Sequence, residues 1–202
     1  MSFIVAIAGG SGAGKSTIAA ALAERLGARA ALIAEDDYYI CRTAFAAFEE
    51  TTHDFDRPEA KDHALLAAHL AHARRGEAFE KPVYRHADHR RAGFETFAPN
   101  GVLILEGLHA FATPTLRETI DLAVYIEADE ALAYLRREAR DVLHRGRTRE
   151  SVRAQWEATV LPAYRETVAP QRASADLVLV STAAGGVREA QAHAEAILAL
   201  VP

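Results

Sequence analysis

The chemistry-bearing feature nearest the start of the chain is a glycine-rich segment that ends in a lysine and a serine. Residues 9–16 read GGSGAGKS and match the pattern G-x-x-x-x-G-K-[ST]. The segment follows an apolar run at Phe3–Ile7 and precedes a helical pattern at Thr17–Leu26, which is the context that a P-loop requires. A P-loop surrounds phosphate oxygens with backbone N–H groups, its lysine neutralises the β/γ charge, and its serine ligates Mg²⁺. The predicted phosphate-binding residues are Gly9, Gly10, Ser11, Gly12, Ala13, Gly14, Lys15, Ser16 and Thr17.

The remainder of the sequence narrows the class of P-loop protein. A GTPase needs an Asn-Lys-x-Asp motif to bind guanine, but the only asparagine is Asn100 and glycine follows it. Motor and remodelling ATPases need a longer chain than 202 residues. The sequence therefore predicts a small kinase that uses Mg²⁺ and ATP, with an acceptor site and a charged lid that excludes water during transfer.

Carboxylates follow two of the apolar runs. Glu106 comes directly after Val102–Leu105, and Glu35-Asp36-Asp37 comes after Ala31–Ala34. The carboxyl ends of parallel strands lie at the same sheet edge as a P-loop, so these acids are expected near the phosphates. Glu106 is a candidate to organise Mg²⁺ together with Ser16, and one acid of the second group could accept the acceptor's hydroxyl proton. The alternatives are an ordinary acid at a strand end and a solvated acidic turn.

Arginines are dense between Arg136 and Arg153. On a helix, Arg140 lies on the same face as Arg136 and Arg137, and Gly146 then ends the helix. Arg145 and Arg147 flank this glycine on a joint that could move. Planar guanidinium groups suit a phosphoryl group in transfer, so the segment 136–153 is predicted to be a lid. A solvated basic face or an RNA-binding patch is the alternative.

Apolar runs alternate with helical patterns along the whole chain, which is typical of a three-layer α/β domain. The predicted strands are Phe3–Ile7, Ala31–Ala34, Val102–Leu105, Leu122–Ile126 and Leu177–Val180. The predicted helices are Thr17–Leu26, Pro58–Arg75, Glu130–Leu143, Arg149–Val168 and Val187–Leu200. The charged and aromatic segment 79–99 interrupts the alternation and is predicted to project as a β-hairpin. We therefore expect a P-loop NTPase fold with a five-stranded parallel sheet and helices on both faces.

The composition limits the organisation of the chain and its partners. The 202 residues predict a single domain spanning 1–202, and a net charge of −5 argues against non-specific nucleic-acid or membrane binding. The single cysteine, Cys41, excludes an intramolecular disulfide and is typical of a reducing, cytoplasmic location. No apolar run is long enough for a transmembrane helix. The sequence leaves homo-oligomerisation open.

Several blocks together resemble the uridine kinases of the phosphoribulokinase/uridine kinase family. After the P-loop the resemblance continues through Glu35–Tyr39, Asp54–Ala60, Lys81–Tyr84, His89-x-Arg91, Leu105–Gly107, Arg136–Arg147, Gln155 and Ala175-Asp176. It therefore covers nearly the whole chain. The activity that it implies is ATP-dependent phosphorylation of the 5′-hydroxyl of uridine or cytidine, which yields UMP or CMP in pyrimidine salvage.

The resemblance also implies roles for individual residues. Asp36 would be the general base and a Mg²⁺ partner, and Tyr39 would line the sugar site. Asp56 would accept both ribose hydroxyls, helped by Arg137, although Asp56 could equally cap a helix that starts at Pro58.

Recognition of the base and of the phosphates is implied in the same way. Tyr84 would stack on the pyrimidine or hydrogen-bond to it, and His89 would bind the polar edge of the ring. Arg147 and Gln155 would complete base recognition. The implied catalytic residues are Lys15, Asp36, Arg140 and Arg145, with both arginines closing over the phosphates.

Four residues depart from the family's usual pattern. Arg57 replaces a common histidine, Asp37 replaces a small hydroxyl residue, and Arg85 and His86 replace an acidic and an aromatic residue after Tyr84. If Arg57, Arg85 and His86 formed an anion site, a sugar phosphate or a pantothenate-like alcohol would be the acceptor. A regulatory protein that binds nucleotide without turnover is the third hypothesis.

Overall fold

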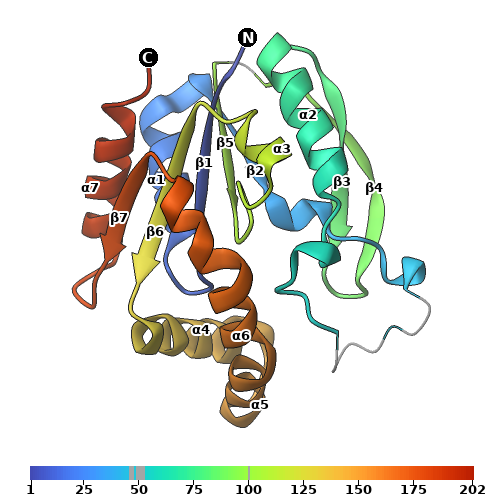
Figure 1. The fold of residues 1–202 in the computed structure, drawn as a ribbon, viewed down its shortest axis with the longest axis vertical. Coiled ribbons are helices and arrows are strands. Elements are labelled where there is room, and N and C mark those ends of the chain that lie inside the picture. Colours follow the sequence, from blue (N-terminus) through green and yellow to red (C-terminus); the bar gives the residue numbers. More distant parts are fainter. Residues whose placement is uncertain (46–47, 49–52, 100) are drawn as a thin grey trace.

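The computed structural model describes residues 1–45, 48, 53–99 and 101–202, and its centre is a five-stranded parallel sheet (Figure 1). The strand order is β2-β5-β1-β6-β7. The strands are β1 (Phe3–Gly9), β2 (Ala30–Ala34), β5 (Val102–Gly107), β6 (Leu122–Ala128) and β7 (Leu177–Ser181). The helices are α1 (Lys15–Leu26), α2 (His63–Arg75), α3 (Pro114–Arg117), α4 (Glu130–Arg145), α5 (Arg149–Gln155), α6 (Leu161–Ala163) and α7 (Val187–Leu198). The predicted P-loop fold is confirmed.

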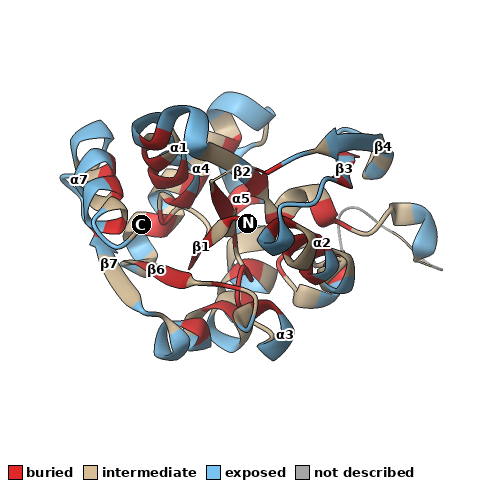
Figure 2. Ribbon diagram, turned by 90° about the horizontal axis from the view of Figure 1, so that it is seen from above, coloured by how far each residue is buried: buried red, intermediate tan, exposed pale blue. Residues whose placement is uncertain are grey.

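Helices cover both faces of the sheet, so the central strands are apolar until their carboxyl ends (Figure 2). Along β1, Ile4 and Ala6 pack into the core beneath α2 and α3, while Val5 and Ile7 pack into the core beneath α1 and α7. All four side chains are fully buried. This two-sided burial explains why the strands appear in the sequence as continuous rather than alternating apolar runs.

The segment 79–99 forms the predicted hairpin. Strands β3 (Phe79–Arg85) and β4 (Arg90–Phe97) pair antiparallel as a separate two-stranded sheet, with a register irregularity between Val83 and Tyr84. Figure 1 shows the hairpin beside α2, on the far side of that helix from β7. The turn between the strands contains His89, which adopts a positive φ of 52°. The hairpin thereby holds Tyr84 and the turn residues near the carboxyl edge of the central sheet.

The helix predicted from Pro58 begins later than expected. Residues Pro58–Ala60 form only a short 3-10 turn, and α2 starts at His63 with the Asp62 carboxylate accepting the backbone N–H of Leu65 at 3.0 Å. The reason is that Lys61 is extended, with φ −124° and ψ 147°, and pairs with Tyr39 in an antiparallel bridge. Asp56 therefore caps no helix, and its carboxylate is available for another role.

The segment after α4 is a helical arm rather than one regular helix. The predicted helix Arg149–Val168 is present as α5 and α6 separated and followed by π-helical stretches at Trp156–Val160 and Tyr164–Val168. Pro162 lies between the two stretches and has no N–H to donate, which disfavours a regular α-helical ladder. The arm lies below the sheet edge and beside α4 in Figure 1.

Candidate active site

The P-loop connects β1 to α1 and has the backbone that its glycines permit. Gly9, Gly12 and Gly14 have positive φ values of 149°, 82° and 98°. A Cβ at Gly12 would lie 2.2 Å from the carbonyl oxygen of Ala133, so α4 approaches the loop too closely for any side chain there. Helix α1 begins at Lys15, so its N-terminus faces the loop and favours an anion. The loop thus has the form of a phosphate cradle.

Lys15 is buried and donates a hydrogen bond to the carbonyl oxygen of Gly10 at 2.9 Å. Burial lowers the pKa of Lys15, against the attraction of Glu106 and Asp36. The ammonium therefore lies inside the loop, where an incoming phosphate would replace the single carbonyl contact by a charged one.

Ser16 and Glu106 place a pair of oxygen ligands at the start of α1 and the end of β5. The Ser16 hydroxyl donates to Glu106 Oε2 at 3.1 Å. Burial raises the pKa of Glu106 against the pull of Lys15, and the nearby charge of Asp36 adds to the rise. A hydroxyl and two neighbouring carboxylates are the hard oxygen donors that Mg²⁺ prefers, so Ser16, Glu106 and Asp36 fit the predicted cation.

The acidic turn forms a 3-10 helix, Glu35–Tyr38, directly after β2. The Glu35 carboxylate is completely buried and accepts from Lys61 Nζ at 2.9 Å, His63 Nε2 at 2.7 Å and the backbone N–H of His109 at 3.0 Å. Burial alone would raise the pKa of Glu35, but the Lys61 ammonium and the histidine contacts hold this pKa well below its ordinary value. A Cβ at Gly107 would lie 2.1 Å from Glu35 Oε2, so the glycine after Glu106 makes room for this carboxylate.

Glu35, His63 and His109 resemble a metal-binding triad. One ligand atom from each lies within 4.8 Å of the others. The Lys61 ammonium is already hydrogen-bonded to the same carboxylate, however, and is itself buried. A resident ammonium supplies the positive charge that a metal ion would otherwise bring, so the cluster is complete as it stands.

The two aspartates of the acidic turn also have lysine partners. Asp36 Oδ1 lies 3.0 Å from Lys61 Nζ, and half of the Asp36 side chain (49%) remains exposed. Burial would raise the pKa of Asp36, but Lys61 outweighs it and the pKa lies below the ordinary value. Asp37 Oδ2 lies 2.6 Å from Lys81 Nζ, which also pairs with Glu95 at 3.0 Å. Asp37 is thus tied to the hairpin, whereas the Asp36 side chain remains half exposed.

Aromatic rings gather beside the acidic turn. The Tyr39 ring lies 5.2 Å from the Tyr84 ring, and the Tyr39 hydroxyl donates to the carbonyl oxygen of Phe55 at 3.2 Å. His89 stacks on Phe55 with ring centroids 4.8 Å apart. His86, which replaces an aromatic residue of the family pattern, contacts Tyr84 edge-on with ring centroids 5.1 Å apart, so an imidazole takes part in this ring cluster. The residues predicted to contact sugar and base therefore lie together.

Asp56 faces the arginine-rich segment 136–153. Its side chain is only 11% exposed, and Oδ1 lies 3.6 Å from Arg137 Nη1. Arg137 Nη2 donates to Gln155 Oε1 at 3.0 Å, and Arg147 donates to the same oxygen. The structure thus brings together the four residues predicted to bind ribose and complete base recognition.

Four arginines of segment 136–153 converge on one buried carboxylate, Asp141, which was not among the site residues predicted from the sequence. Its oxygens lie within 4.0 Å of four guanidinium groups, those of Arg137 (3.5 Å), Arg140 (2.9 Å), Arg145 (3.4 Å) and Arg147 (3.8 Å). Arg140 also reaches the P-loop, with Nη2 3.5 Å from Ser11 Oγ. The spacing of Asp141, four residues after Arg137 and four before Arg145, was the available signal.

Comparison with known proteins agrees with this geometry. A sequence model of the phosphoribulokinase/uridine kinase family matches residues 4–185. A uridine kinase from Shewanella amazonensis is 37% identical over 182 residues, which span 87% of this chain and 86% of that protein. The chain belongs to the phosphoribulokinase/uridine kinase family. The protein is therefore a phosphotransferase that uses ATP as co-substrate.

Solved structures similar to this family member show the same fold. A Silicibacter protein provisionally described as a fructose transport system kinase has a TM-score of 0.75 at 24% identity, with 88% of this chain and 89% of that chain covered. Phosphoribulokinase from Rhodobacter spheroides has a TM-score of 0.64 at 17% identity, with 89% and 70% covered. Among the residues that the structure describes, no helix is both long enough and apolar enough to cross a bilayer.

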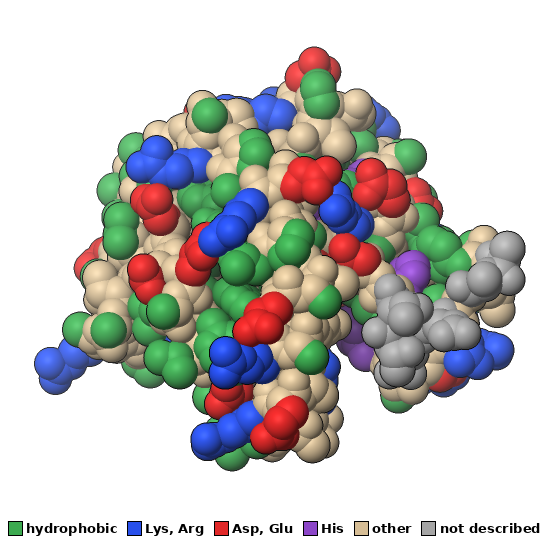
Figure 3. All heavy atoms as spheres, turned by 60° about the horizontal axis from the view of Figure 1, so that its bottom comes forward, with side chains coloured by type: hydrophobic (Ala, Val, Ile, Leu, Met, Phe, Trp, Pro, Cys, Tyr) green, Lys and Arg blue, Asp and Glu red, His purple; other side chains and the backbone are tan. Residues whose placement is uncertain are grey.

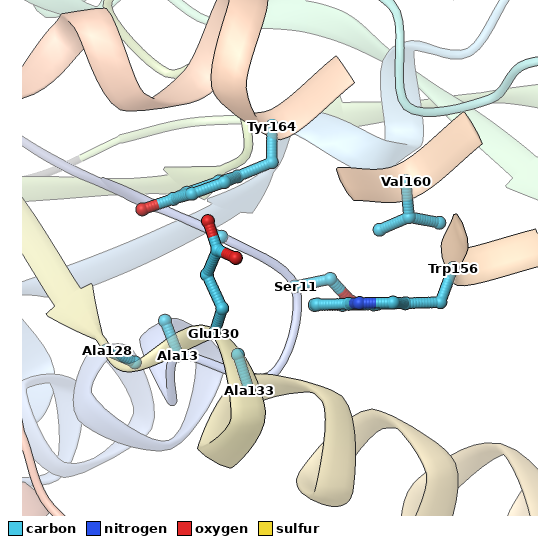
Figure 4. A pocket seen from close by; sticks show the side chains of 9 residues that line it. Ser11, Ala13, Ala128, Glu130, Ala133, Trp156, Val160 and Tyr164 are labelled. Atoms are coloured by element: carbon cyan, nitrogen blue, oxygen red, sulfur yellow. The ribbon is translucent and has the colours of Figure 1, made fainter. Parts of the chain in front are cut away.

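Two adjoining pockets lie beside the P-loop. One is lined by Gly10, Ser11, Ala13, Ala128, Glu130, Ala133, Trp156, Val160 and Tyr164 (Figure 4). The other is lined by Gly10, Ser11, Asp56, Leu108, Val160, Tyr164 and Val168. Figure 3 shows a hollow between the helical arm and the part of the molecule that carries the hairpin, with histidine side chains visible in it. The P-loop residues Gly10 and Ser11 thus line the second pocket together with Asp56.

The three residues that could have formed an acceptor anion site do not assemble one. Arg57 pairs with Glu166 at 2.7 Å and with Asp54 at 3.3 Å. Arg85 pairs with Asp88 at 2.6 Å and is more than half exposed. The charges of Arg57 and Arg85 are therefore already paired with nearby carboxylates. His86 instead contacts the rings of Tyr39 and Tyr84.

Proposed function

We propose that this protein transfers the γ-phosphoryl group of ATP to the 5′-hydroxyl of uridine or cytidine, forming UMP or CMP. One observation carries the proposal: Asp56, a nearly buried carboxylate, lines the same pocket as P-loop residues Gly10 and Ser11. A carboxylate that accepts from both hydroxyls of a cis-diol would hold a ribose with its 5′ end directed at the phosphates. Such a site favours a neutral diol and repels an acceptor that carries its own phosphate or carboxylate.

The acceptor site residues take the following roles in this proposal. Asp36 accepts the 5′-hydroxyl proton, and Tyr39 lines the sugar site. Tyr84 and His89 contact the pyrimidine from the hairpin. Their rings already pack with those of Tyr39 and Phe55, which supports a preformed aromatic site for a base.

The lid completes the site from the opposite side. Arg137 assists Asp56 at the ribose, and Arg147 with Gln155 contacts the base. Arg140 and Arg145 bind the phosphates, and the contact of Arg140 with Ser11 supports this placement. Lys15 neutralises charge on the β- and γ-phosphates as the transition state forms.

Mg²⁺ is the metal that the oxygen donors of Ser16, Glu106 and Asp36 suit, and when bound it would neutralise phosphate charge. We further propose that residues 1–202 act as one kinase domain with the hairpin 79–99 and the lid 136–153. A cytoplasmic setting suits its single cysteine, Cys41.

A coupled assay that follows ADP release tests the acceptor class. The panel contains ribonucleosides, 2′-deoxynucleosides, a sugar phosphate, D-glycerate and pantothenate, each with Mg·ATP. Uridine and cytidine should give the highest kcat/KM. A preference for any anionic alcohol would contradict the proposal, and ATP consumption without a phosphorylated acceptor would point to a protein that no longer acts as a kinase.

A further inference from the structure

Lysine is rare in this chain and is confined to one region. Only three of the 23 basic residues are lysines: Lys15, Lys61 and Lys81. All three are buried, with exposed fractions of 8%, 4% and 6%. Lys15 lies in the P-loop, and the other two pair with the acidic turn. Lys61 and Lys81 each pair with two carboxylates, and a compact ammonium with three donors fits between such close oxygens better than a planar guanidinium, in a chain that otherwise uses arginine.

Lys61 bridges two carboxylates of different exposure. Its Nζ lies 2.9 Å from Oε2 of the buried Glu35 and 3.0 Å from Oδ1 of the half-exposed Asp36. The Lys61 side chain is fully buried, and its Nζ lies 4.9 Å from the centroid of the Tyr39 ring. The ammonium therefore has one partner inside the protein and one partner at the reaction site.

The backbone fixes Lys61 in this place. The N–H of Asp62 donates to the carbonyl oxygen of Tyr38, and the N–H of Ile40 donates to that of Ala60, both at 2.9 Å. These bonds flank the bridge between Lys61 and Tyr39. The segment that carries Lys61 is thus tied directly to the turn that carries Asp36.

Glu35 is in turn an anchor for Lys61. His63 and the backbone N–H of His109 hold its carboxylate, and Gly107 leaves the space that it fills. Glu35 has no exposed surface and cannot itself reach a substrate. Its charge serves to hold the ammonium, because a buried carboxylate needs a compensating partner.

We propose that Lys61, anchored by Glu35, is a positioning residue that fixes the Asp36 carboxylate for phosphoryl transfer. With Oδ1 held by the ammonium, Oδ2 is left to face the acceptor hydroxyl. In the step, the acceptor O–H bond breaks and its proton goes to Asp36 Oδ2. The acceptor oxygen forms a bond to the γ-phosphorus, and the bond to the bridging oxygen breaks with its electron pair leaving on ADP. This inference rests on the proposed role of Asp36 as the base.

The test compares variants that change charge while keeping size. Lys61→Met removes the ammonium, and the double variant Glu35→Gln/Lys61→Met removes both charges so that no buried carboxylate is left unpaired. Lys81→Met is the matched control, because Lys81 is a buried lysine on the same turn that contacts Asp37 rather than Asp36. For each protein, kcat, the KM values for uridine and ATP, and the thermal unfolding midpoint are measured.

We expect kcat to fall by roughly 10- to 100-fold in both Lys61 variants, since a displaced reacting group costs rates of that order. Both KM values should stay within about threefold of wild type, and the double variant should unfold near the wild-type temperature. Lys81→Met should keep kcat within about threefold. In Lys61→Ala, methylammonium should restore kcat in a concentration-dependent way, whereas tetramethylammonium at equal ionic strength should not.

A double variant with wild-type kcat would overturn the inference, as would a loss that appears only in KM. Equal rescue by methylammonium and tetramethylammonium would also overturn it. Tetramethylammonium has no N–H group, so such rescue would be a general salt effect rather than a hydrogen bond to Asp36. If the wild type phosphorylates another alcohol but no ribonucleoside, the proposed function fails instead. The same kcat ratios on that alcohol then decide the role of Lys61.

Discussion

Discrimination between ribose and deoxyribose should depend on Asp56. Its carboxylate is 11% exposed, and Arg137, its one close cation among the residues that the structure describes, lies 3.6 Å away, beyond a normal hydrogen bond. A 2′-deoxynucleoside would leave one lone pair of this carboxylate without a donor in a nearly dry pocket. An unpaired buried polar group costs about 1–3 kcal/mol, which corresponds to roughly 10- to 100-fold in kcat/KM.

The assay compares uridine with 2′-deoxyuridine on three proteins. Wild type should prefer uridine by roughly 10- to 100-fold in kcat/KM. Asp56→Ala should lose most activity on uridine and bring the two substrates to within about threefold of each other, because no carboxylate remains to be left unpaired. Glu59→Ala, which removes an exposed carboxylate from the same segment, should keep the wild-type ratio.

Equal rates of wild type on the two nucleosides would refute the reasoning about Asp56. So would an Asp56→Ala variant that still discriminates, since the 2′-hydroxyl would then have another partner. Preference for an anionic acceptor would favour the alternative in which Arg57 and Arg85 bind the acceptor.

Four other perturbations test the rest of the site. Lys15→Met should reduce transfer by at least about 10²-fold, because the P-loop charge is lost; near-normal turnover would contradict its role. Since Lys15 is buried and bonded to Gly10, the variant's unfolding midpoint must be recorded with its rate. Asp36→Asn should lower kcat by about 10²-fold or more with little change in the KM for uridine, and an unchanged kcat would exclude it as the base. Asp141→Asn should raise the KM for ATP, because four guanidinium groups lose their common anchor; unchanged ATP kinetics would show that the lid holds its form without it. The lowered pKa of Glu35 means that its contribution to stability is full above its ordinary pKa of 4.5 and is lost as pH falls through the folded value. Urea unfolding from pH 7 downward should therefore show a steeper loss for wild type than for Glu35→Gln, and parallel curves would contradict the assignment.

The features that the sequence predicts correctly depend on local or repeated patterns. Strands buried on both faces leave continuous apolar runs, and the P-loop needs eight consecutive residues. The start of α2 was predicted wrongly because Pro58 has the features of a first helical residue. The bridge between Lys61 and Tyr39, residues distant in sequence, overrides that local preference.

The interior contacts of the site could not be predicted for the same reason. Lys61 meets Glu35 across 26 residues, and His109 meets Glu35 across 74. No local pattern marks such pairs, since any buried charge could have found a different partner. Asp141 is nearer to its arginines in sequence, but a mixed-charge helix usually indicates a solvated face, and only packing shows that this carboxylate is buried.

The proposed reaction at this P-loop site is phosphoryl transfer from ATP to a nucleoside 5′-hydroxyl. Phosphorus NMR of the protein with uridine, ATP and Mg²⁺ tests it most directly, because it identifies both products and the position of the new ester. We predict equimolar ADP and 5′-UMP with wild type and neither with Lys15→Met. Formation of ADP and inorganic phosphate without 5′-UMP, or of UMP by the Lys15 variant at the wild-type rate, would contradict the claim.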